Sequence, residues 1–165
     1  MLIRRFEEND RDGVRRIHVE AFGRPDEARL VEALLDAGDA VAGLSLVAEV
    51  DEGLVGHVMC SRATVGANAV VALGPIGVLP ERQGLGVGSR LVRAALTEAD
   101  ALGAPLVALL GSTAYYSRFG FVSAESLGIH APDATWGASF QARTLTAYDP
   151  ALVGPFRYAP AFGLS

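Results

Sequence analysis

The sequence contains no lysine, and all 14 of its basic residues are arginines. Any site that requires a lysine, such as the Walker-type phosphate loop, is therefore excluded. Cysteine is almost absent as well, because Cys60 stands alone. A single cysteine rules out an internal disulfide and a cysteine-based zinc cluster, and it fits a reducing compartment.

Long hydrophobic runs are also missing. The most apolar segment, AVVALGPIGVLP at positions 69–80, is interrupted by glycine and proline and is too short to span a bilayer. The first residues, MLIRRFEEND, lack the apolar core of a signal peptide. A net charge of −5 without a basic run argues against binding to nucleic acid. We therefore expect a cytoplasmic protein that has neither membrane nor nucleic acid as a partner.

The residues that are present indicate one compact domain. A chain of 165 residues, half of them hydrophobic, is long enough to bury a single core. We expect residues 1–165 to form one domain. The segment 145–165 is rich in proline and aromatic residues, and we expect it to be a tail packed on the body without regular structure.

The spacing of apolar residues predicts a succession of strands and helices. For the first half we expect a strand at 2–6, two helices within 10–37, a hairpin of strands 45–50 and 54–65, and a strand at 69–79. For the second half we expect a helix at 89–102, a strand at 105–111, one or two helical turns at 113–120, and closing strands at 121–126 and 139–146. A strand, a helix and a continuous apolar strand in succession predict a parallel pair, so the fold class is α/β.

A glycine-rich turn stands between the strand at 69–79 and the following helix. It reads VLPERQGLGVGSR, with glycines at 84, 86 and 88. Such a turn can direct several backbone N–H groups at one anion, or it can be a tight connection only. The dinucleotide fingerprint G-x-G-x-x-G/A does not fit, because its sixth position falls on Ser89 or Leu91.

Two motifs in this chain resemble those of the GNAT family of acyl-CoA-dependent N-acyltransferases. Gln83, Gly86 and Gly88 match the family's Q/R-x-x-G-x-G/A at the start of its central helix. Downstream, YSRFGF at 116–121 has the family's Y-x-x-x-G-F pattern. The expected order of strands and helices also agrees, and the resemblance covers about residues 1–146.

The resemblance implies a mixed, mostly antiparallel sheet with flanking helices, in which the parallel strands 69–79 and 105–111 splay apart. Coenzyme A is then expected to lie in the opening between these strands, without a metal. Its pantetheine arm is expected to pair with backbone at Ile76, Gly77 and Val78. The residues that match the family's diphosphate contacts are Gln83, Gly84, Leu85, Gly86, Val87 and Gly88.

The same resemblance implies that an acetyl group passes from acetyl-CoA to a primary amine by direct attack on the thioester. Tyr116 matches the tyrosine that protonates the departing thiolate, a role that suits a phenol because it is protonated at neutral pH. Tyr115 is the competing tyrosine, and it is expected to pack. A backbone N–H near Val78 is expected to stabilise the oxyanion.

No residue is assigned as the base that removes the amine's proton. The strand at 69–79 carries no carboxylate, and Glu20, Glu49 and His57 remain alternatives. Cys60 could form an acyl-enzyme, but a small buried thiol is the competing interpretation. Where the family usually has an asparagine, GSTAYY offers Ser112 and Thr113, either of which can cap the helix.

Two hypotheses for the function stay open at this point. The first is an N-acetyltransferase whose acceptor is a small-molecule or peptide amine. The second is a catalytically weak GNAT-like module that binds acyl-CoA as a sensor or partner domain, which the missing base would explain. A homodimer is compatible with both hypotheses.

Overall fold

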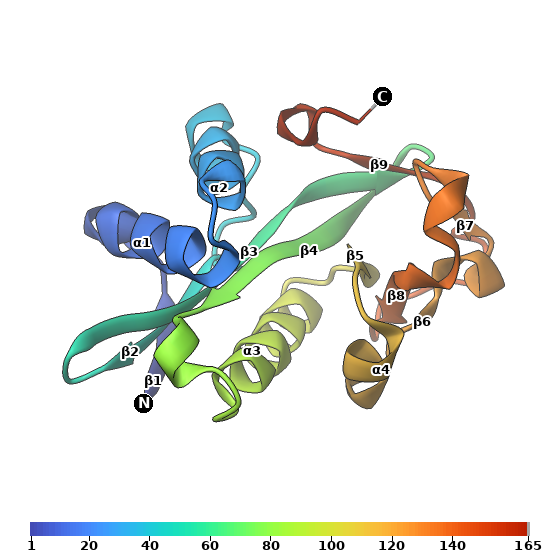
Figure 1. The fold of residues 1–165 in the computed structure, drawn as a ribbon. Coiled ribbons are helices and arrows are strands. Elements are labelled where there is room, and N and C mark those ends of the chain that lie inside the picture. The colour runs from blue at the N-terminus through green and yellow to red at the C-terminus, as the bar shows by residue number, and fades with distance from the viewer. Residues whose placement is uncertain (165) are drawn as a thin grey trace. The chain divides into compact units, whose positions relative to one another are not determined.

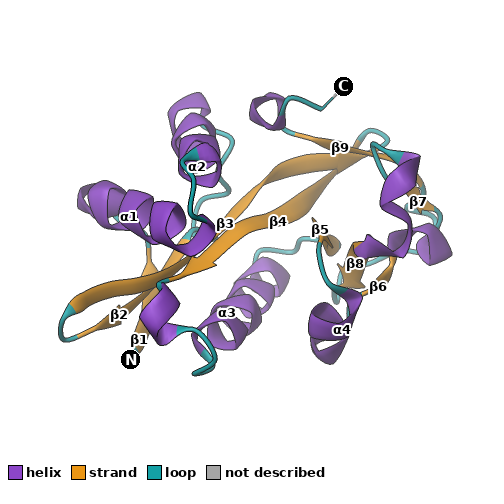
Figure 2. Ribbon diagram, viewed as in Figure 1, coloured by secondary structure: helices purple, strands orange, loops and turns teal. Residues whose placement is uncertain are grey.

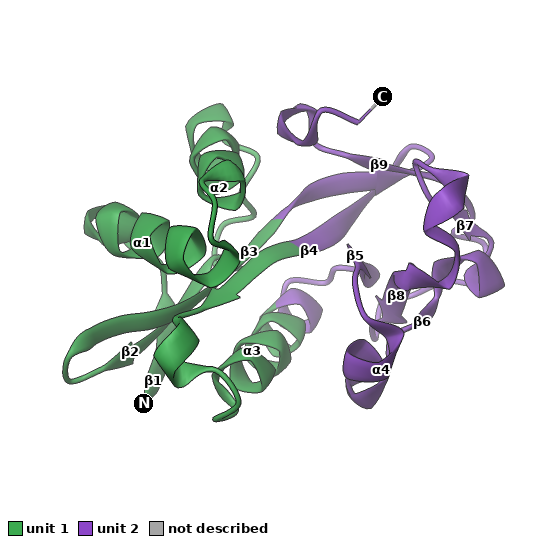
Figure 3. Ribbon diagram, in the orientation of Figure 1, with its two compact units in different colours: residues 1–60, 74–98 green, residues 61–73, 99–165 purple. Residues whose placement is uncertain are grey.

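The computed structural model describes residues 1–164, and the chain divides into two compact units (Figure 3). Unit 1 comprises Met1–Cys60 and Gly74–Glu98, and unit 2 comprises Ser61–Leu73 and the residues from Ala99 onward. Two long strands contribute to both units, and the last three residues of one helix, residues 99–101, lie in unit 2. Each unit is described by itself. The single domain over residues 1–165 stays a prediction.

Unit 1 combines part of a β-sheet with three helices (Figure 1). Its sheet runs in the order β1, β2, β3, β4, and the pairs β1–β2 and β2–β3 are antiparallel. The strands are β1 (Leu2–Arg5), β2 (Leu46–Val50), β3 (Gly53–Val65) and β4 (Asn68–Val78). The helices are α1 (Arg11–Phe22), α2 (Asp26–Ala37) and α3 (Val87–Ala101), with short 3-10 turns η1 (Glu8–Asp10) and η2 (Pro80–Arg82).

A β-bulge determines which side chains of β3 face which helix. The register pairs Ala48 with Gly56 and Glu49 with Leu54, so Val55 is an extra residue on β3. Leu54 consequently lies under Gly13 of α1, whereas Gly56 faces α3. Figure 1 shows α1 and α2 on one side of β3 and β4, with α3 on the other.

Unit 2 is built from short strands and 3-10 turns around the ends of β3 and β4 (Figure 2). The strands are β5 (Leu106–Leu110), β6 (Val122–Ser123), β7 (Ile129–His130), β8 (Phe140–Thr144) and β9 (Gly154–Tyr158). The helical segments are α4 (Thr113–Tyr116), η3 (Ser117–Phe119), η4 (Ala124–Leu127), η5 (Ala134–Ser139) and η6 (Pro160–Phe162). In unit 2 the order β4, β5, β8, β6 continues the sheet.

The predicted parallel pair is present and short. β4 and β5 pair through Val71 with Val107 and through Ala72 with Ala108. β5 then pairs antiparallel with β8 along its whole length. Gly74, the second residue after the last parallel pair on β4, has a φ of 133°, which departs from a regular strand. The predicted class, a mixed and mostly antiparallel sheet with one parallel pair and flanking helices, is confirmed.

Two local predictions are wrong. The expected irregular tail contains β9, which pairs antiparallel with Ala63–Val65 of β3 and parallel with β7. Buried and exposed residues alternate along β9, with Phe156 in the core and Arg157 outside. The pattern is hard to recognise in the sequence, because prolines flank it and its pairing partners are distant in the chain. The expected strand at 121–126 ends after Ser123, where the chain turns into η4.

The core of unit 2 depends on this tail. Phe156 is 1% exposed, and its ring lies 5.1 Å from the ring of Phe140 and 4.9 Å from that of Tyr158. These aromatic residues belong to one buried cluster with residues of β3, β4, β5 and β8. The tail therefore supplies core side chains as well as a strand.

We expect Phe156→Ala to lower the free energy of unfolding by about 3–5 kcal/mol, because it removes a buried aromatic ring and leaves a cavity. Urea unfolding followed by circular dichroism measures this loss. The control is Val153→Ala, at a position 53% exposed, which should change stability by less than about 0.5 kcal/mol. Equal effects of the two substitutions would contradict the role of β9 in the core.

Candidate functional site

The glycine turn has the backbone conformation that its sequence predicts. Gly84 and Gly86 have φ values of 75° and 86°, in the left-handed region that residues with a Cβ rarely adopt. No neighbouring atom lies within 4 Å of a Cβ built at either position. Leu85 between them is 70% exposed, and both glycines are exposed too, so their backbone reaches the surface.

The turn leads directly into α3. The N–H of Arg90 donates to the carbonyl of Gly86 over 3.1 Å, which makes Gly86 the residue that precedes the first turn of the helix. The first backbone N–H groups of a helix have no acceptor within it, and they carry partial positive charge. The first turn of α3 contains no acidic residue, whereas α1 has Asp12 and α2 has Asp26 at the same place. This end of α3 is therefore suited to an anion.

Two contacts within unit 1 hold the turn in place. The side-chain amide of Gln83 donates to the carbonyl of Val78 over 3.0 Å, linking the turn to the end of β4. On β3, a Cβ at Gly56 would lie 2.9 Å from Val87 and 3.0 Å from Leu91, so the absence of a side chain lets α3 pack closely on the sheet.

The end of β4 carries the three residues predicted to pair with pantetheine. Gly77 is buried, and Ile76 and Val78 are partly buried. A Cβ at Gly77 would lie 2.9 Å from Nδ1 of His18 and 3.3 Å from Ile17, both on α1. Gly77 thus brings the backbone of β4 against the imidazole of His18.

His18 belongs to a buried hydrogen-bonded chain that the sequence did not reveal. Its Nε2 lies 2.8 Å from Nδ1 of His57, and Nε2 of His57 lies 2.8 Å from Oγ of Ser45. Burial lowers the pKa of His18 to about 4 and that of His57 well below its usual value, so both rings are neutral. Nδ1 of His18 is buried without a hydrogen-bond partner, a state that costs about 1–3 kcal/mol.

Tyr116 lies in unit 2, at the end of α4. Ser112 caps this helix by accepting a hydrogen bond from the N–H of Tyr115, as one of the two predicted alternatives. The ring of Tyr116 packs 5.7 Å from Phe121, and a Cβ at Gly111 would lie 2.6 Å from it. Burial, with a smaller contribution from Tyr115, raises the pKa of Tyr116 to about 12, so its phenol stays protonated.

The loop beneath Tyr116 is fixed by a buried side chain. Gln141 of β8 is 1% exposed, and its amide donates to the carbonyl of Gly111 over 3.0 Å. The N–H of Gly111 donates to the carbonyl of Ser139 over 2.9 Å. Gly111 is therefore held on both of its backbone groups, directly beside the ring of Tyr116.

Other candidate residues are engaged elsewhere. Glu20 pairs with Arg16 at 3.2 Å, and Glu49 pairs with Arg4 at 3.1 Å. Burial raises the pKa of Cys60 to about 12, which keeps it a neutral thiol and a poor nucleophile.

Tyr115 packs, as expected. Its ring lies 5.4 Å from Phe119, and the guanidinium of Arg118 lies 4.6 Å from the centre of the ring.

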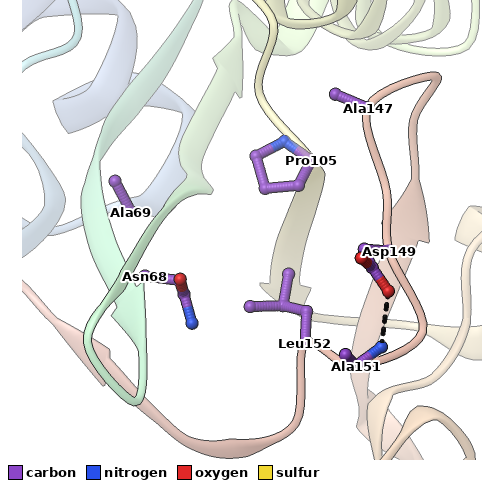
Figure 4. Close-up of a pocket in the computed structure, with 7 residues that line it drawn as sticks. All are labelled: Asn68, Ala69, Pro105, Ala147, Asp149, Ala151 and Leu152. Carbon is purple, nitrogen blue, oxygen red and sulfur yellow. Dashed lines mark hydrogen bonds between the residues drawn. The ribbon is translucent and has the colours of Figure 1, made fainter.

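Unit 2 also contains a cavity of about 330 Å³ between its loops (Figure 4). It is lined by Asn68, Ala69, Pro105, Ala147, Asp149, Ala151 and Leu152. Asp149 is engaged by the backbone N–H of Ala151 at 2.9 Å. None of the residues predicted to bind coenzyme A or to act in catalysis lines this cavity.

Two kinds of site are absent from residues 1–164, a metal site and a membrane-spanning helix. No group of three or more His, Cys, Asp or Glu side chains in this part of the chain is arranged to hold a metal ion. No helix in the same range has the length and hydrophobicity to cross a membrane.

The predicted residues are thus divided between two units. Unit 1 brings together the end of β4, the glycine turn and the first residues of α3, including Gly88, and it adds the unpredicted His18. Unit 2 holds Tyr116. His57, one of the candidate bases, lies in the middle of the histidine chain, between His18 and Ser45. The contact between His18 and Gly77 could not be read from the sequence, because it forms only when α1 packs on β4.

Comparison with known proteins gives a consistent result. A sequence profile of the Acetyltransferase (GNAT) family matches residues 11–121. The Uncharacterized N-acetyltransferase YjhQ of Escherichia coli K12 is 35% identical over 161 residues, which cover 93% of this chain and 89% of that protein.

Solved structures agree with the sequence comparison. The N-acetyltransferase YhbS of Escherichia coli, in complex with CoA, is 30% identical with a TM-score of 0.90, covering 98% of this chain and 91% of that one. A GNAT family acetyltransferase from Brucella melitensis, in complex with acetyl-CoA, is 32% identical with a TM-score of 0.80, covering 98% and 97%.

We expect Gly111→Ala to destabilise the protein by about 1–3 kcal/mol, because the added methyl group would overlap the ring of Tyr116. Urea unfolding measures the loss. In a Tyr116→Ala background the same substitution should cost less, since the overlapping ring is gone, which gives a coupling energy of about 0.5–3 kcal/mol. An identical cost in both backgrounds would show that Tyr116 does not rest on Gly111.

Proposed function

Because the chain belongs to the Acetyltransferase (GNAT) family, we propose that it transfers the acetyl group of acetyl-CoA to a primary amine by direct attack on the thioester. The observation that carries the proposal is the turn at Gly84 and Gly86, whose left-handed backbone leads into the first turn of α3. The complexes of the two similar structures with CoA and acetyl-CoA support this choice of cosubstrate.

In this proposal the diphosphate of the cosubstrate binds at the glycine turn. Backbone N–H groups from Gln83 to Gly88 provide the hydrogen bonds, and the N-terminal end of α3 adds favourable charge. Left-handed glycines allow successive N–H groups to point toward one ligand. The exposed backbone around Leu85 and the absence of acidic residues from the first turn of α3 both support this role.

The pantetheine arm is proposed to lie along β4 at Ile76, Gly77 and Val78. An arm that carries amide groups can pair with a strand end much as an added strand does. The carbonyl of Val78 already accepts from Gln83, so the N–H groups of this segment are the more suitable partners. One such N–H near Val78 would stabilise the oxyanion, an interaction worth about 3 kcal/mol of barrier.

Tyr116 is proposed as the proton donor to the thiolate of coenzyme A. Its pKa of about 12 means that the phenol holds its proton throughout the neutral range. A thiolate buried in the same complex also has its pKa raised by desolvation, which brings donor and acceptor closer together. Packing on Phe121 and Gly111 restricts the ring, and a restricted donor loses less entropy in the transition state.

The acceptor is proposed to be a small-molecule or peptide amine. The alternative, an acyl-CoA-binding sensor with little turnover, rests on the absence of a carboxylate from β4. The packing of Tyr116 against Gly111 favours the enzyme hypothesis, because a sensor would need no positioned proton donor. Binding of acetyl-CoA without thiol release for any amine would favour the sensor.

We expect Tyr116→Phe to lower kcat about 10²- to 10⁴-fold while the affinity for acetyl-CoA stays within about twofold, because only the transferred proton is lost. Thiol release from acetyl-CoA in the presence of a panel of primary amines measures kcat, and calorimetry measures the affinity. Tyr115→Phe is the matched control and should keep the wild-type rate. Unchanged turnover in Tyr116→Phe would remove its role as the acid.

We expect Gly86→Ala to weaken acetyl-CoA binding about 10- to 100-fold. Alanine rarely adopts the positive φ of Gly86, so the turn must change conformation and lose a hydrogen bond to a charged group, worth about 1.5–3 kcal/mol. Binding of S-acetyl-pantetheine, which has no diphosphate, should be unaffected. Calorimetry with the two ligands makes the comparison. Gly23→Ala, at an equally open position with a φ of 67°, controls for backbone strain. Equal weakening for both ligands would place the diphosphate elsewhere.

A further inference from the structure

Tyr116, the proposed acid, lies on a segment that crosses one face of β8. This Tyr116 segment, residues 111–121, leaves β5 after Leu110 and enters β6 at Val122. Both strands pair antiparallel with β8, one on each side of it. β5 and β6 therefore run in the same direction with β8 between them, and the connection must pass over β8. Its attachment to β8 decides where the ring of Tyr116 lies.

The side chains of β8 alternate between the core of unit 2 and the Tyr116 segment. Phe140 and Ala142 are 2% and 0% exposed, and they belong to the buried cluster of unit 2. Because successive residues of a strand point to opposite faces, Gln141 and Arg143 lie on the other face. These two side chains both donate hydrogen bonds to the backbone of the Tyr116 segment.

Gln141 holds the beginning of the Tyr116 segment. Its side chain is buried, and its amide donates to the carbonyl of Gly111 over 3.0 Å. The ring of Tyr116 lies on the backbone of Gly111, where an added Cβ would come within 2.6 Å of it. Because a hydrogen bond is directional, Gln141 fixes the orientation of the peptide group on which the ring rests.

Arg143 holds the other end of the Tyr116 segment. Its Nε donates to the carbonyl of Phe119 over 2.9 Å, and its Nη1 donates to the carbonyl of Thr144. One guanidinium thus ties the last residue of η3 to the end of β8. Gly120 makes this contact possible, because its φ is 85° and a Cβ there would lie 2.6 Å from Nε of Arg143. The glycine of the Y-x-x-x-G-F pattern therefore leaves room for the arginine.

Hydrogen bonds within the Tyr116 segment connect its two fixed ends to Tyr116. The N–H of Tyr116 donates to the carbonyl of Ser112 over 3.0 Å, and the N–H of Gly120 donates to that of Ser117 over 3.0 Å. The rings of Tyr116 and Phe119 lie 6.2 Å apart. Because α4 and η3 are only four and three residues long, a displacement at either end also moves the ring.

We propose that Gln141 and Arg143 are positioning residues for the acid: they fix both ends of the Tyr116 segment on β8 and thereby set the place of the phenol. This inference rests on the proposed function, in which Tyr116 protonates the thiolate. In this role both residues act through the carbonyls that they hold, and neither exchanges a proton with the substrate. A general acid must lie within hydrogen-bond reach of its acceptor, so a displaced phenol loses efficiency although its chemistry is unchanged.

The kinetic test compares Gln141→Met and Arg143→Met with wild type, since methionine is long and flexible but donates no hydrogen bond. Thiol release from acetyl-CoA is measured with tyramine, spermidine and a short peptide with a free N-terminus. We expect each substitution to lower kcat about 10- to 100-fold, because a displacement of about 1 Å costs this much. The affinity for acetyl-CoA, measured by calorimetry, should stay within about twofold, because the proposed diphosphate site lies in unit 1.

A double-mutant cycle distinguishes positioning from a general loss of folded protein. In a Tyr116→Phe background there is no acid to position, so Gln141→Met should lower kcat by less than about twofold. The stoichiometry of acetyl-CoA binding gives the folded fraction, to which each rate is normalised. A loss by the same factor in both backgrounds would mean that Gln141 only supports the fold, and it would overturn the positioning role.

Two controls remove comparable groups elsewhere in unit 2. Asp100→Ala removes a carboxylate that accepts from the N–H and the hydroxyl of Thr146, each over 3.0 Å. Arg157→Met removes an exposed arginine of β9. Both should keep kcat within about twofold of wild type. A loss in Asp100→Ala equal to that in Gln141→Met would show that any loosening of unit 2 slows the reaction, which would contradict a specific role of β8.

The possible results separate the positioning role from the proposed function. Wild-type kcat in Gln141→Met or in Arg143→Met would overturn the positioning role of that residue and leave the proposed function intact. Absence of thiol release by wild type with all three amines, despite binding of acetyl-CoA, would instead overturn the proposed function and the positioning role with it.

A further measurement needs no variant and no acceptor. Hydrogen exchange of the wild-type protein reports whether the Tyr116 segment is held in place. We expect the N–H groups of Tyr116 and Gly120 to exchange at least about 100-fold more slowly than in an unfolded peptide. Exchange at the rate of an unfolded peptide would show that Gln141 and Arg143 do not fix the segment, and it would overturn the proposal even if neither variant folds.

Discussion

The contact between α3 and Gly56 of β3 is the constraint on which the position of the glycine turn and of the anion site proposed there depends. A side chain at Gly56 would collide with both Val87 and Leu91, so only a bare backbone allows the helix to rest directly on the sheet. That contact fixes the first turn of α3, and the hydrogen bond from Gln83 to Val78 ties the preceding turn to β4. The helix end is then held rigidly, so binding an anion there costs little ordering.

The sequence predicted what is encoded locally. The glycine turn, the helix after it and the Tyr116 motif each lie within a few residues, and their conformations follow from backbone preferences and helical spacing. The tail was missed because β9 becomes a strand only by pairing with Ala63–Val65, far away in the chain. His18 was missed for the same reason. In the sequence of α1 it is one more inward-facing residue. What distinguishes it is its contacts with His57 on β3 and Gly77 on β4, which only the folded structure shows.

Burial acts in one direction on the titratable groups of the interior. It lowers the pKa values of His18 and His57 and raises those of Cys60 and Tyr116, so each group is driven toward its neutral form. Most of the ion pairs that the structure describes lie instead on more exposed side chains, as with Arg16 and Glu20, although Asp10, which pairs with Arg4, is buried. The charged form of any of these four groups would be costly inside the protein, because burial removes the water that would solvate it.

Glycines serve this protein in two physically different ways. Gly84 and Gly86 are required by their positive φ values, in open surroundings where a side chain would meet nothing. Gly77 and Gly111 lie outside the left-handed region, and space alone excludes a side chain, because His18 rests on one and Tyr116 on the other. Each of these two rings thus packs on a glycine backbone within its own unit. A ring that rests on backbone is held by atoms that cannot change rotamer, so its orientation is fixed more firmly than packing against side chains alone would allow.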